Sequence, residues 1–230
     1  MFSSPKYSPM GDRALLVRFG DTIDLNINSK VHALCRAIEE AKVYGVEECV
    51  PAYASLLVYY NPLKTSYERL VFQLKDLEPR LEKIGAKMRG LKIVVPVVYG
   101  GKFGPDLHNV AKYHNLTEKE VIRIHSETEY AVFMIGFVEG FPYMSKVPGA
   151  IATPRLDTPR LKIPAGSVGI AGNQTGIYPC ESPGGWQIIG RTPLTLFNPY
   201  AKQPALFKPG DHVKFKSITV KEFETISRKA

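Results

Sequence analysis

The sequence has 230 residues, enough for one large domain or two small ones with buried cores. Hydrophobic residues at 44% and charged residues at 23% are typical of a soluble globular protein. No apolar run is long enough to span a membrane, and residues 1–10 lack the apolar segment of a signal peptide. We therefore expect a cytoplasmic protein. The net charge of +8 does not indicate nucleic-acid binding, because half of the excess lies in the last 37 residues and no RNA-binding motif or DNA-reading helix is present.

Residues 1–90 are predicted to form a small α+β domain in which helices pack on a sheet. The second of its two helices begins at a capping box, Thr65–Glu68, and Pro79 is expected to split or bend it. The first helix has one buried stripe, formed by Ile27, Val31, Leu34, Cys35 and Ile38. The predicted order is two strands, a helix, two strands and a helix, with the strands at 6–18, 46–53 and 55–60.

Residues 91–230 are predicted to form the second domain, which follows a hinge at 85–90. It opens with the apolar strand KIVVPVVY, followed by a short helix at 106–114. A capping box at Thr117–Glu120 starts a further helix. The remaining strands outside the glycine- and proline-rich stretch are expected at 130–137, 194–197 and 211–215.

The stretch from Gly136 to Arg191 holds 10 of the 19 glycines, 7 of the 18 prolines and the single tryptophan. Glycine permits backbone conformations closed to other residues and proline fixes φ, so this mixture predicts short strands joined by specified turns. With few charges, it is typical of loops that present a functional surface from a rigid barrel. The alternative is an all-β domain whose turns simply need glycine.

Standard catalytic constellations are absent from the sequence: there is no GxSxG, HExxH, Walker loop or GxGxxG, and the five histidines and three cysteines have no metal-ligand spacing. His125 lies four residues before Glu129, at the end of a predicted helix, and we expect this pair to be the acid–base candidates. The alternative is a helix-end histidine bonded to the backbone.

Three arginines are candidates for binding an anion. Arg155 and Arg160 each follow a Thr-Pro pair that stiffens the backbone, and Arg191 follows a glycine, so two or three guanidinium groups could clamp a carboxylate or phosphate. The alternative is surface pairing with local acids such as Asp157. The other residues expected to line a substrate pocket are Gln174, Tyr178, Ser182 and Trp186.

Aromatic residues beside glycines predict a protein interface in the same stretch. We expect Phe141, Tyr143 and Trp186 to be exposed there and to contribute to a shared pocket or interface. The alternative places Trp186 in the core of the barrel.

The motifs of the stretch together resemble one family. They are GFVEGFPY (136–143), TPR and TPR (153–160), IPAGSVGIAGNQTGIYP (163–179) and ESPGGWQIIGRTPLTLF (181–197), with YGGKFGPDL (99–107) and GDRALLVRFG (11–20) before them. In these motifs the chain is similar to the allophanate hydrolase subunit 1-like family, which includes the B subunit of 5-oxoprolinase and an inhibitor of a sporulation histidine kinase. The match covers nearly the whole chain.

This resemblance implies an α+β fold in which a small α/β N-terminal domain precedes a cyclophilin-like β-barrel of the carboxyltransferase type. It also implies partners: a second, carboxyltransferase-like subunit and a third, metal-dependent one. Such systems are associated with the ATP-dependent opening of 5-oxoproline to glutamate. No cofactor is expected on this chain itself, and ATP is expected at the level of the complex.

Two hypotheses follow. In the first, the chain is a non-autonomous hydrolase subunit that binds a small carboxylate-bearing amide, with 5-oxoproline as the first candidate. In the second, it is a protein-binding inhibitor of a sensor histidine kinase, and the glycine- and proline-rich loops with Trp186 form the interface.

Overall fold

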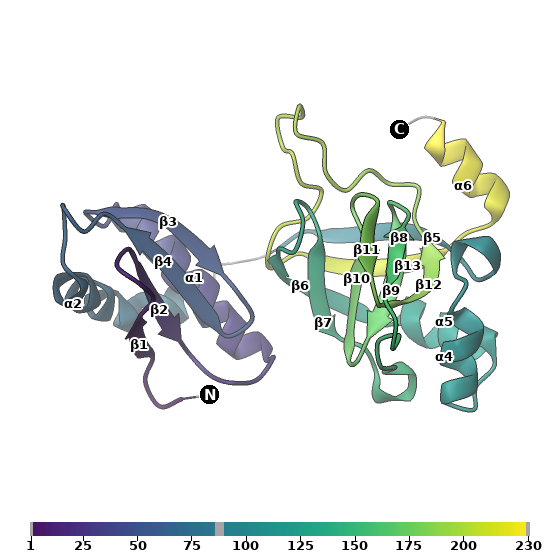
Figure 1. Cartoon of the computed structure of the whole chain (residues 1–230), viewed down its shortest axis with the longest axis horizontal. Helices are drawn as coiled ribbons and strands as arrows, with labels where there is room; N and C mark the ends of the chain where they lie inside the picture. Colours follow the sequence, from purple (N-terminus) through teal and green to yellow (C-terminus); the bar gives the residue numbers. More distant parts are fainter. Residues whose placement is uncertain (1, 86–89, 229–230) are drawn as a thin grey trace. The chain divides into compact units, whose positions relative to one another are not determined.

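A computed structural model describes residues 2–85 and 90–228 of the chain (Figure 1). The chain divides into two compact units, Met1–Arg89 and Gly90–Ala230, which are described separately below. Most of the predicted hinge at 85–90 lies outside the described residues. No helix in the described part is both long and apolar enough to cross a membrane.

Unit 1 is a four-stranded antiparallel sheet with helices on one face (Figure 1). In the order β1-β2-β4-β3, the strands are β1 (Lys6–Pro9), β2 (Ala14–Arg18), β4 (Ser55–Tyr60) and β3 (Val46–Pro51). The helices are α1 (Leu25–Ala41), α2 (Tyr67–Leu77) and α3 (Leu81–Gly85), with a 3-10 turn, η1 (Glu78–Arg80), between the last two.

The core of unit 1 follows the predicted apolar stripe. Helix α1 buries Ile27, Val31, Leu34 and Ile38 against the sheet and α2, whereas Cys35 is only half-buried. The second helix bends where Pro79 was expected to act, because the α-helix ends at Leu77 and continues as a 3-10 turn. Its N-cap is Ser66, one residue later than predicted, and Ser66 Oγ accepts a hydrogen bond from the backbone N–H of Arg69 at 3.3 Å.

Unit 2 contains a closed seven-stranded barrel, as the resemblance implied (Figure 1). The hydrogen-bonded order is β10-β7-β6-β13-β5-β12-β9, and the pair β13–β5 is parallel. In chain order these strands are β5 (Lys92–Tyr99), β6 (Glu129–Ile135), β7 (Pro142–Lys146), β9 (Ser167–Ala171), β10 (Gln174–Ile177), β12 (Gln187–Arg191) and β13 (His212–Ser217).

Short helices and a small second sheet surround the barrel. The helices are α4 (Leu107–Tyr113), α5 (Glu118–Glu127) and α6 (Val220–Ser227), with 3-10 turns η2 (Gly101–Phe103) and η3 (Gly149–Ile151). The small sheet pairs β8 (Arg160–Ile163) with β11 (Ser182–Gly184). The strand predicted at 194–197 is not formed: Phe197 makes only one isolated bridge, to Ala205.

Two apolar clusters fill unit 2. The barrel interior is lined by residues such as Val95, Val97 and Ile189. Neighbouring residues on a strand point to opposite faces, so Ile188 of β12 faces outward, where it joins Ile163 of β8 in a second cluster with Phe141, Tyr178 and Trp186. The small sheet therefore covers one outer face of the barrel, and the candidate site is built there.

Candidate functional site

A recess of about 70 Å³ lies at the junction of the β8 strand, the β12 strand and the η2 turn. Four cationic side chains line it: Lys102 from η2, Arg160 and Lys162 from β8, and Arg191 from the end of β12. The rest of its lining is largely apolar or proline, and includes Phe103, Pro105, Ile163, Pro164, Ser167 and Ile188. We call this feature the cationic recess.

Arg160 is held in the recess by a buried carboxylate. Its two terminal nitrogens donate to Asp106 Oδ2 at 2.8 Å and Oδ1 at 2.7 Å, and the Asp106 side chain is 2% exposed. The backbone N–H of Ile188 also donates to Asp106 Oδ2, at 2.7 Å. A bidentate pair anchored in this way fixes the position and plane of the guanidinium.

The backbone places Asp106 where it can do this. The segment before it lies directly on β12: the N–H of Gly100 donates to the carbonyl of Ile189 at 3.0 Å, and the N–H of Asp106 donates to that of Ile188 at 2.9 Å. A Cβ on Gly104 would lie 2.0 Å from the Ile189 carbonyl oxygen, so only glycine permits this approach.

The other cations of the recess are less constrained. Arg191 donates from Nε to the carbonyl of Ala165 at 2.7 Å and has no carboxylate partner among the described residues. Lys162 pairs with Glu181 at 3.1 Å, and both side chains are mostly exposed. The Nζ of Lys102 lies 5.3 Å from the centroid of the neighbouring Phe103 ring.

Beside the recess, across Ile163 and Ile188, lies an aromatic cluster. The Phe141 ring is central to it, with ring centroids 4.8 Å from Tyr143, 5.2 Å from Tyr178 and 5.4 Å from Trp186. Three of its members are almost fully buried within the chain, at 1% exposure for Phe141, 1% for Tyr178 and 6% for Trp186. The expectation that Phe141 and Trp186 are exposed interface anchors is therefore wrong, whereas Tyr143 is only half-buried.

Arg155 lies near this cluster and does not line the recess. Burial raises the pKa of Tyr178 to about 12, against the lowering effects of the Trp186 backbone N–H and the Arg155 guanidinium. Burial also raises the pKa of Tyr143, with Arg155 again opposing the shift. The arginine is exposed and has no carboxylate partner in the described part of the chain. The structure thus brings Arg160 and Arg191 together and leaves Arg155 apart.

The predicted acid–base pair is not formed. His125 is fully buried, with Nδ1 2.8 Å from the Tyr99 hydroxyl and Nε2 3.1 Å from Thr175 Oγ1. Glu129 instead pairs with Lys92 at 3.1 Å and with His212 at 3.0 Å. The sequence spacing failed because helix α5 ends at Glu127, between the two residues: His125 is buried on the helix, whereas Glu129 is the exposed first residue of β6.

The environment of His125 also determines the tautomer and the protonation state of its ring. Thr175 Oγ1 donates its proton to the Gly169 carbonyl at 2.9 Å, so His125 Nε2 must be the donor to Thr175, and Nδ1 accepts from Tyr99. Burial lowers the pKa of His125 to about 3, which keeps the ring neutral. A neutral imidazole with both nitrogens occupied inside the barrel has a structural role, not a catalytic one.

The last two predicted pocket residues do not join either feature. Gln174 begins β10, where it pairs with Ala171 of β9, and is half-buried. Ser182 begins β11 and is 8% exposed, and its hydroxyl has no hydrogen-bond partner among the described residues. Conversely, no sequence pattern pointed to Lys102, Lys162 or Asp106, since the Asp106–Arg160 pair spans 54 residues and leaves no local signal.

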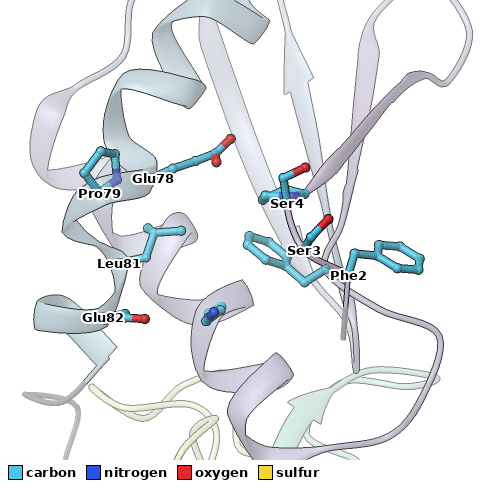
Figure 2. A pocket seen from close by; sticks show the side chains of 10 residues that line it. Phe2, Ser3, Ser4, Glu78, Pro79, Leu81 and Glu82 are labelled. Carbon is cyan, nitrogen blue, oxygen red and sulfur yellow. The ribbon is translucent and has the colours of Figure 1, made fainter.

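Unit 1 also contains a cavity, of about 290 Å³, between the first residues of the chain and the η1–α3 region (Figure 2). Glu78 on its wall accepts a hydrogen bond from the Tyr7 hydroxyl at 2.5 Å. None of the residues predicted to act in catalysis or binding lines this cavity. In the described residues, no group of three or more His, Cys, Asp or Glu side chains is arranged to hold a metal ion.

Comparisons with known proteins place this fold in a family. The family model of the carboxyltransferase domain, subdomain C and D, matches residues 5–207. The B subunit of 5-oxoprolinase from Bacillus subtilis (strain 168) is 45% identical over 224 residues, which cover 93% of this chain and 93% of that protein.

Solved structures have the same fold. A conserved uncharacterized protein from Pyrococcus horikoshii is 52% identical, with a TM-score of 0.56, over 95% of this chain and 100% of that one. The urea amidolyase of K. lactis has a TM-score of 0.76 at 22% identity, which shows a shared fold; the match covers 98% of this chain but only 15% of the amidolyase. The resemblance seen in the sequence motifs is confirmed, and the chain belongs to the carboxyltransferase domain family, subdomain C and D, as a relative of the 5-oxoprolinase B subunits.

Proposed function

We propose that this chain is a non-autonomous subunit of a multi-component, ATP-dependent amidohydrolase that opens 5-oxoproline to glutamate. The observation that carries the proposal is the 45% identity to a 5-oxoprolinase B subunit over 93% of both chains. Similar relatives with the same name occur in Haemophilus influenzae, at 49% identity, and Escherichia coli O157:H7, at 38%.

The side chains support a binding role for this subunit. Ring opening adds water across the lactam C–N bond and requires a nucleophile or an activated water with a base. The base expected from the sequence, His125, is enclosed within the barrel and cannot reach a substrate at the surface. The chain would therefore bind and orient substrate while its partners supply the reacting groups.

Arg155 is the residue best placed to hold the substrate carboxylate. Its guanidinium is exposed, has no carboxylate partner in the described part of the chain and lies near the half-buried Tyr143. A guanidinium binds a carboxylate through two parallel hydrogen bonds, and a tyrosine beside it offers both a ring face and a hydroxyl. The surface around Arg155 and the partly exposed Tyr143 is also our proposed contact with the second subunit.

The names and lengths of the relatives support a multi-subunit system. A relative that is named as one subunit of 5-oxoprolinase implies further subunits, and in the urea amidolyase the corresponding region is a small part of a much longer chain. We propose a second, carboxyltransferase-like subunit and a third, metal-dependent one, with ATP used by the assembled complex.

Reconstitution tests the proposal. This chain, its two partner subunits, 5-oxoproline and ATP are mixed, and glutamate release is followed with and without the chain. We expect omission to abolish release and Arg155→Gln to raise the KM for 5-oxoproline at least about tenfold, which corresponds to about 1.4 kcal/mol of lost binding. Arg123→Gln, which removes an exposed arginine paired with Glu127 on α5, is the matched control and should behave as wild type.

Unchanged glutamate release without the chain would contradict the proposal. Dose-dependent inhibition of a histidine kinase's autophosphorylation, together with no effect on glutamate release, would instead support the inhibitor hypothesis.

A further inference from the structure

The cationic recess carries more positive charge than the protein itself neutralises. Four cations line it, and the carboxylates paired with them are Asp106, which holds Arg160, and Glu181, which holds Lys162. Four positive and two negative groups leave a surplus of two positive charges. The Lys162–Glu181 pair is exposed and weak, so counting Glu181 in full makes this surplus of two a lower bound.

The two guanidinium groups in the recess are already positioned for a ligand. Arg160 uses one N–H of each terminal nitrogen on Asp106, which leaves its other donors for a ligand. Arg191 uses only Nε, so the N–H groups of both of its terminal nitrogens remain. Fixing these side chains in the folded protein reduces the entropy that binding would otherwise cost.

The size of the recess limits what it can hold. Its volume of about 70 Å³ is several times the ~10–15 Å³ that one water molecule requires, but far below the ~300–1,000 Å³ of a pocket that encloses a whole organic ligand. The recess therefore suits one small oxyanion, either free or as the end of a larger molecule.

Charge decides which oxyanion fits best. A carboxylate brings one negative charge, whereas a phosphate group brings about −1.5 to −2 near neutral pH and several strong acceptor oxygens. The surplus of two positive charges and two forked guanidinium groups match the phosphate. We propose that the cationic recess is a binding site for a phosphate-type dianion, either inorganic phosphate or the terminal phosphoryl group of a nucleotide.

This inference does not depend on the proposed amidohydrolase function. It concerns a different arginine pair from Arg155 and can be tested on the full chain alone, without partner subunits or 5-oxoproline. A failed reconstitution would not contradict the phosphate site, and a lack of phosphate binding would not contradict the proposed amidohydrolase function.

The test is a titration of the full chain with inorganic phosphate at low ionic strength, followed by NMR signals of the Arg191 side-chain Nε–H and the Ile188 backbone amide. We expect saturable shifts of these signals. The double variant Lys102→Gln/Arg191→Gln should weaken binding at least about tenfold, because it removes the two cations that have no carboxylate partner among the described residues. Arg123→Gln, which removes an exposed arginine of α5 that does not line the recess, is the matched control and should bind phosphate as wild type does.

Arg160 is not used as the test position, because its loss would leave the buried Asp106 without its guanidinium partner and would strongly destabilise unit 2. Thermal melts of the double variant and of wild type check that the variant remains folded. Two further titrations distinguish the ligands: ATP shifting the same signals at lower concentration than phosphate identifies a nucleotide site, and phosphate binding more tightly identifies a free-anion site.

Three outcomes overturn the proposal. One is acetate binding as tightly as phosphate, because the site would then be a carboxylate site. The second is phosphate affinity that is unchanged in the double variant, and the third is shifts that do not saturate.

Discussion

Asp106 and His125 are buried polar side chains that join separate parts of unit 2. Asp106 connects the segment before α4 to Arg160 of β8 and to the backbone of β12. His125 connects α5 to Tyr99 of β5 and Thr175 of β10. A buried polar group is tolerated when all of its hydrogen bonds are made. Removal of one partner leaves a buried donor or acceptor without a hydrogen bond, which destabilises the folded state.

The neutral state of His125 predicts a specific dependence of stability on pH. Its pKa of about 3 in the folded protein is below the ~6.5 of an unfolded chain, so the unfolded state binds a proton that the folded state does not. The contribution to stability is complete above pH 6.5 and is lost progressively as the pH falls toward 3. Between pH 6.5 and 5, wild type should lose about 1.6 kcal/mol that a His125→Gln variant does not lose.

Urea unfolding at both pH values, followed by tryptophan fluorescence, measures this difference. Trp186 is the single tryptophan of the chain and lies in unit 2, so its emission reports on the barrel. Equal losses in wild type and variant would show that His125 does not titrate on unfolding.

For single residues, the sequence predicted the region of the fold in which they lie better than it predicted their exposure and their partners. Seven of the residues selected from the glycine- and proline-rich stretch do lie on or near the outer face of the barrel: Phe141, Tyr143, Arg155, Tyr178, Trp186, Arg160 and Arg191. What could not be predicted is which of them point outward, because Trp186 and Tyr178 are covered by a small sheet that has no periodic pattern of its own. The Asp106–Arg160 pair was equally hidden, since it joins distant segments.

Among the structural elements, the segment between β5 and α4 positions the cationic recess. It turns at Gly100 and Gly101, both with positive φ, and lies against β12 through Gly104. This segment places Asp106 next to the backbone of β12, and Asp106 in turn holds Arg160. The recess therefore depends on the path of the backbone as well as on its four cations.

Gly104→Ala tests this dependence. The new Cβ would meet the Ile189 carbonyl at 2.0 Å, so the segment must move away from β12, and we expect unit 2 to lose about 1–3 kcal/mol of stability and the recess to lose phosphate affinity. Gly149→Ala is the matched control, because a Cβ at Gly149 meets nothing within 4 Å. Urea unfolding and phosphate titration of both variants measure the effects; identical behaviour of the two would contradict the close approach.

Elements with strong periodicity were predicted well, and elements formed by tertiary context were not. The stripe of α1 and the apolar strand β5 depend on residues within one segment, so their spacing reveals them. The β8 and β11 strands are 4 and 3 residues long and contain proline or lysine, so nothing local marks them. The opposite error occurred at Phe197, where apolar sequence predicted a strand that has no continuous partner.

Across the whole molecule, each unit has its own core. The buried residues of unit 1 cluster among themselves around α1, β2 and β4, and those of unit 2 fill and cover the barrel. The family resemblance predicted this division into an α/β part and a barrel, because its motifs extend over nearly the whole chain. Composition alone allowed either one domain or two.

Fragments 1–85 and 90–230 are expected to fold separately, because neither core borrows residues from the other. Each should show a single cooperative thermal transition by circular dichroism, and the second should keep the tryptophan emission of the intact chain. A fragment that melts without a cooperative transition, while the full chain melts cooperatively, would contradict this expectation.

The parallel pairing of β13 with β5 has a consequence for how the protein is made. His212 of β13 pairs with Lys92 of β5, so β5 can form this pairing only after the ribosome has translated a further 120 residues. At roughly 5–20 residues per second, this delay is about 6–24 s, during which β5 has an unpaired edge on the ribosome. Unit 1, whose strands all lie within residues 6–60, can finish its sheet long before then. We therefore expect the nascent barrel, more than unit 1, to benefit from a chaperone.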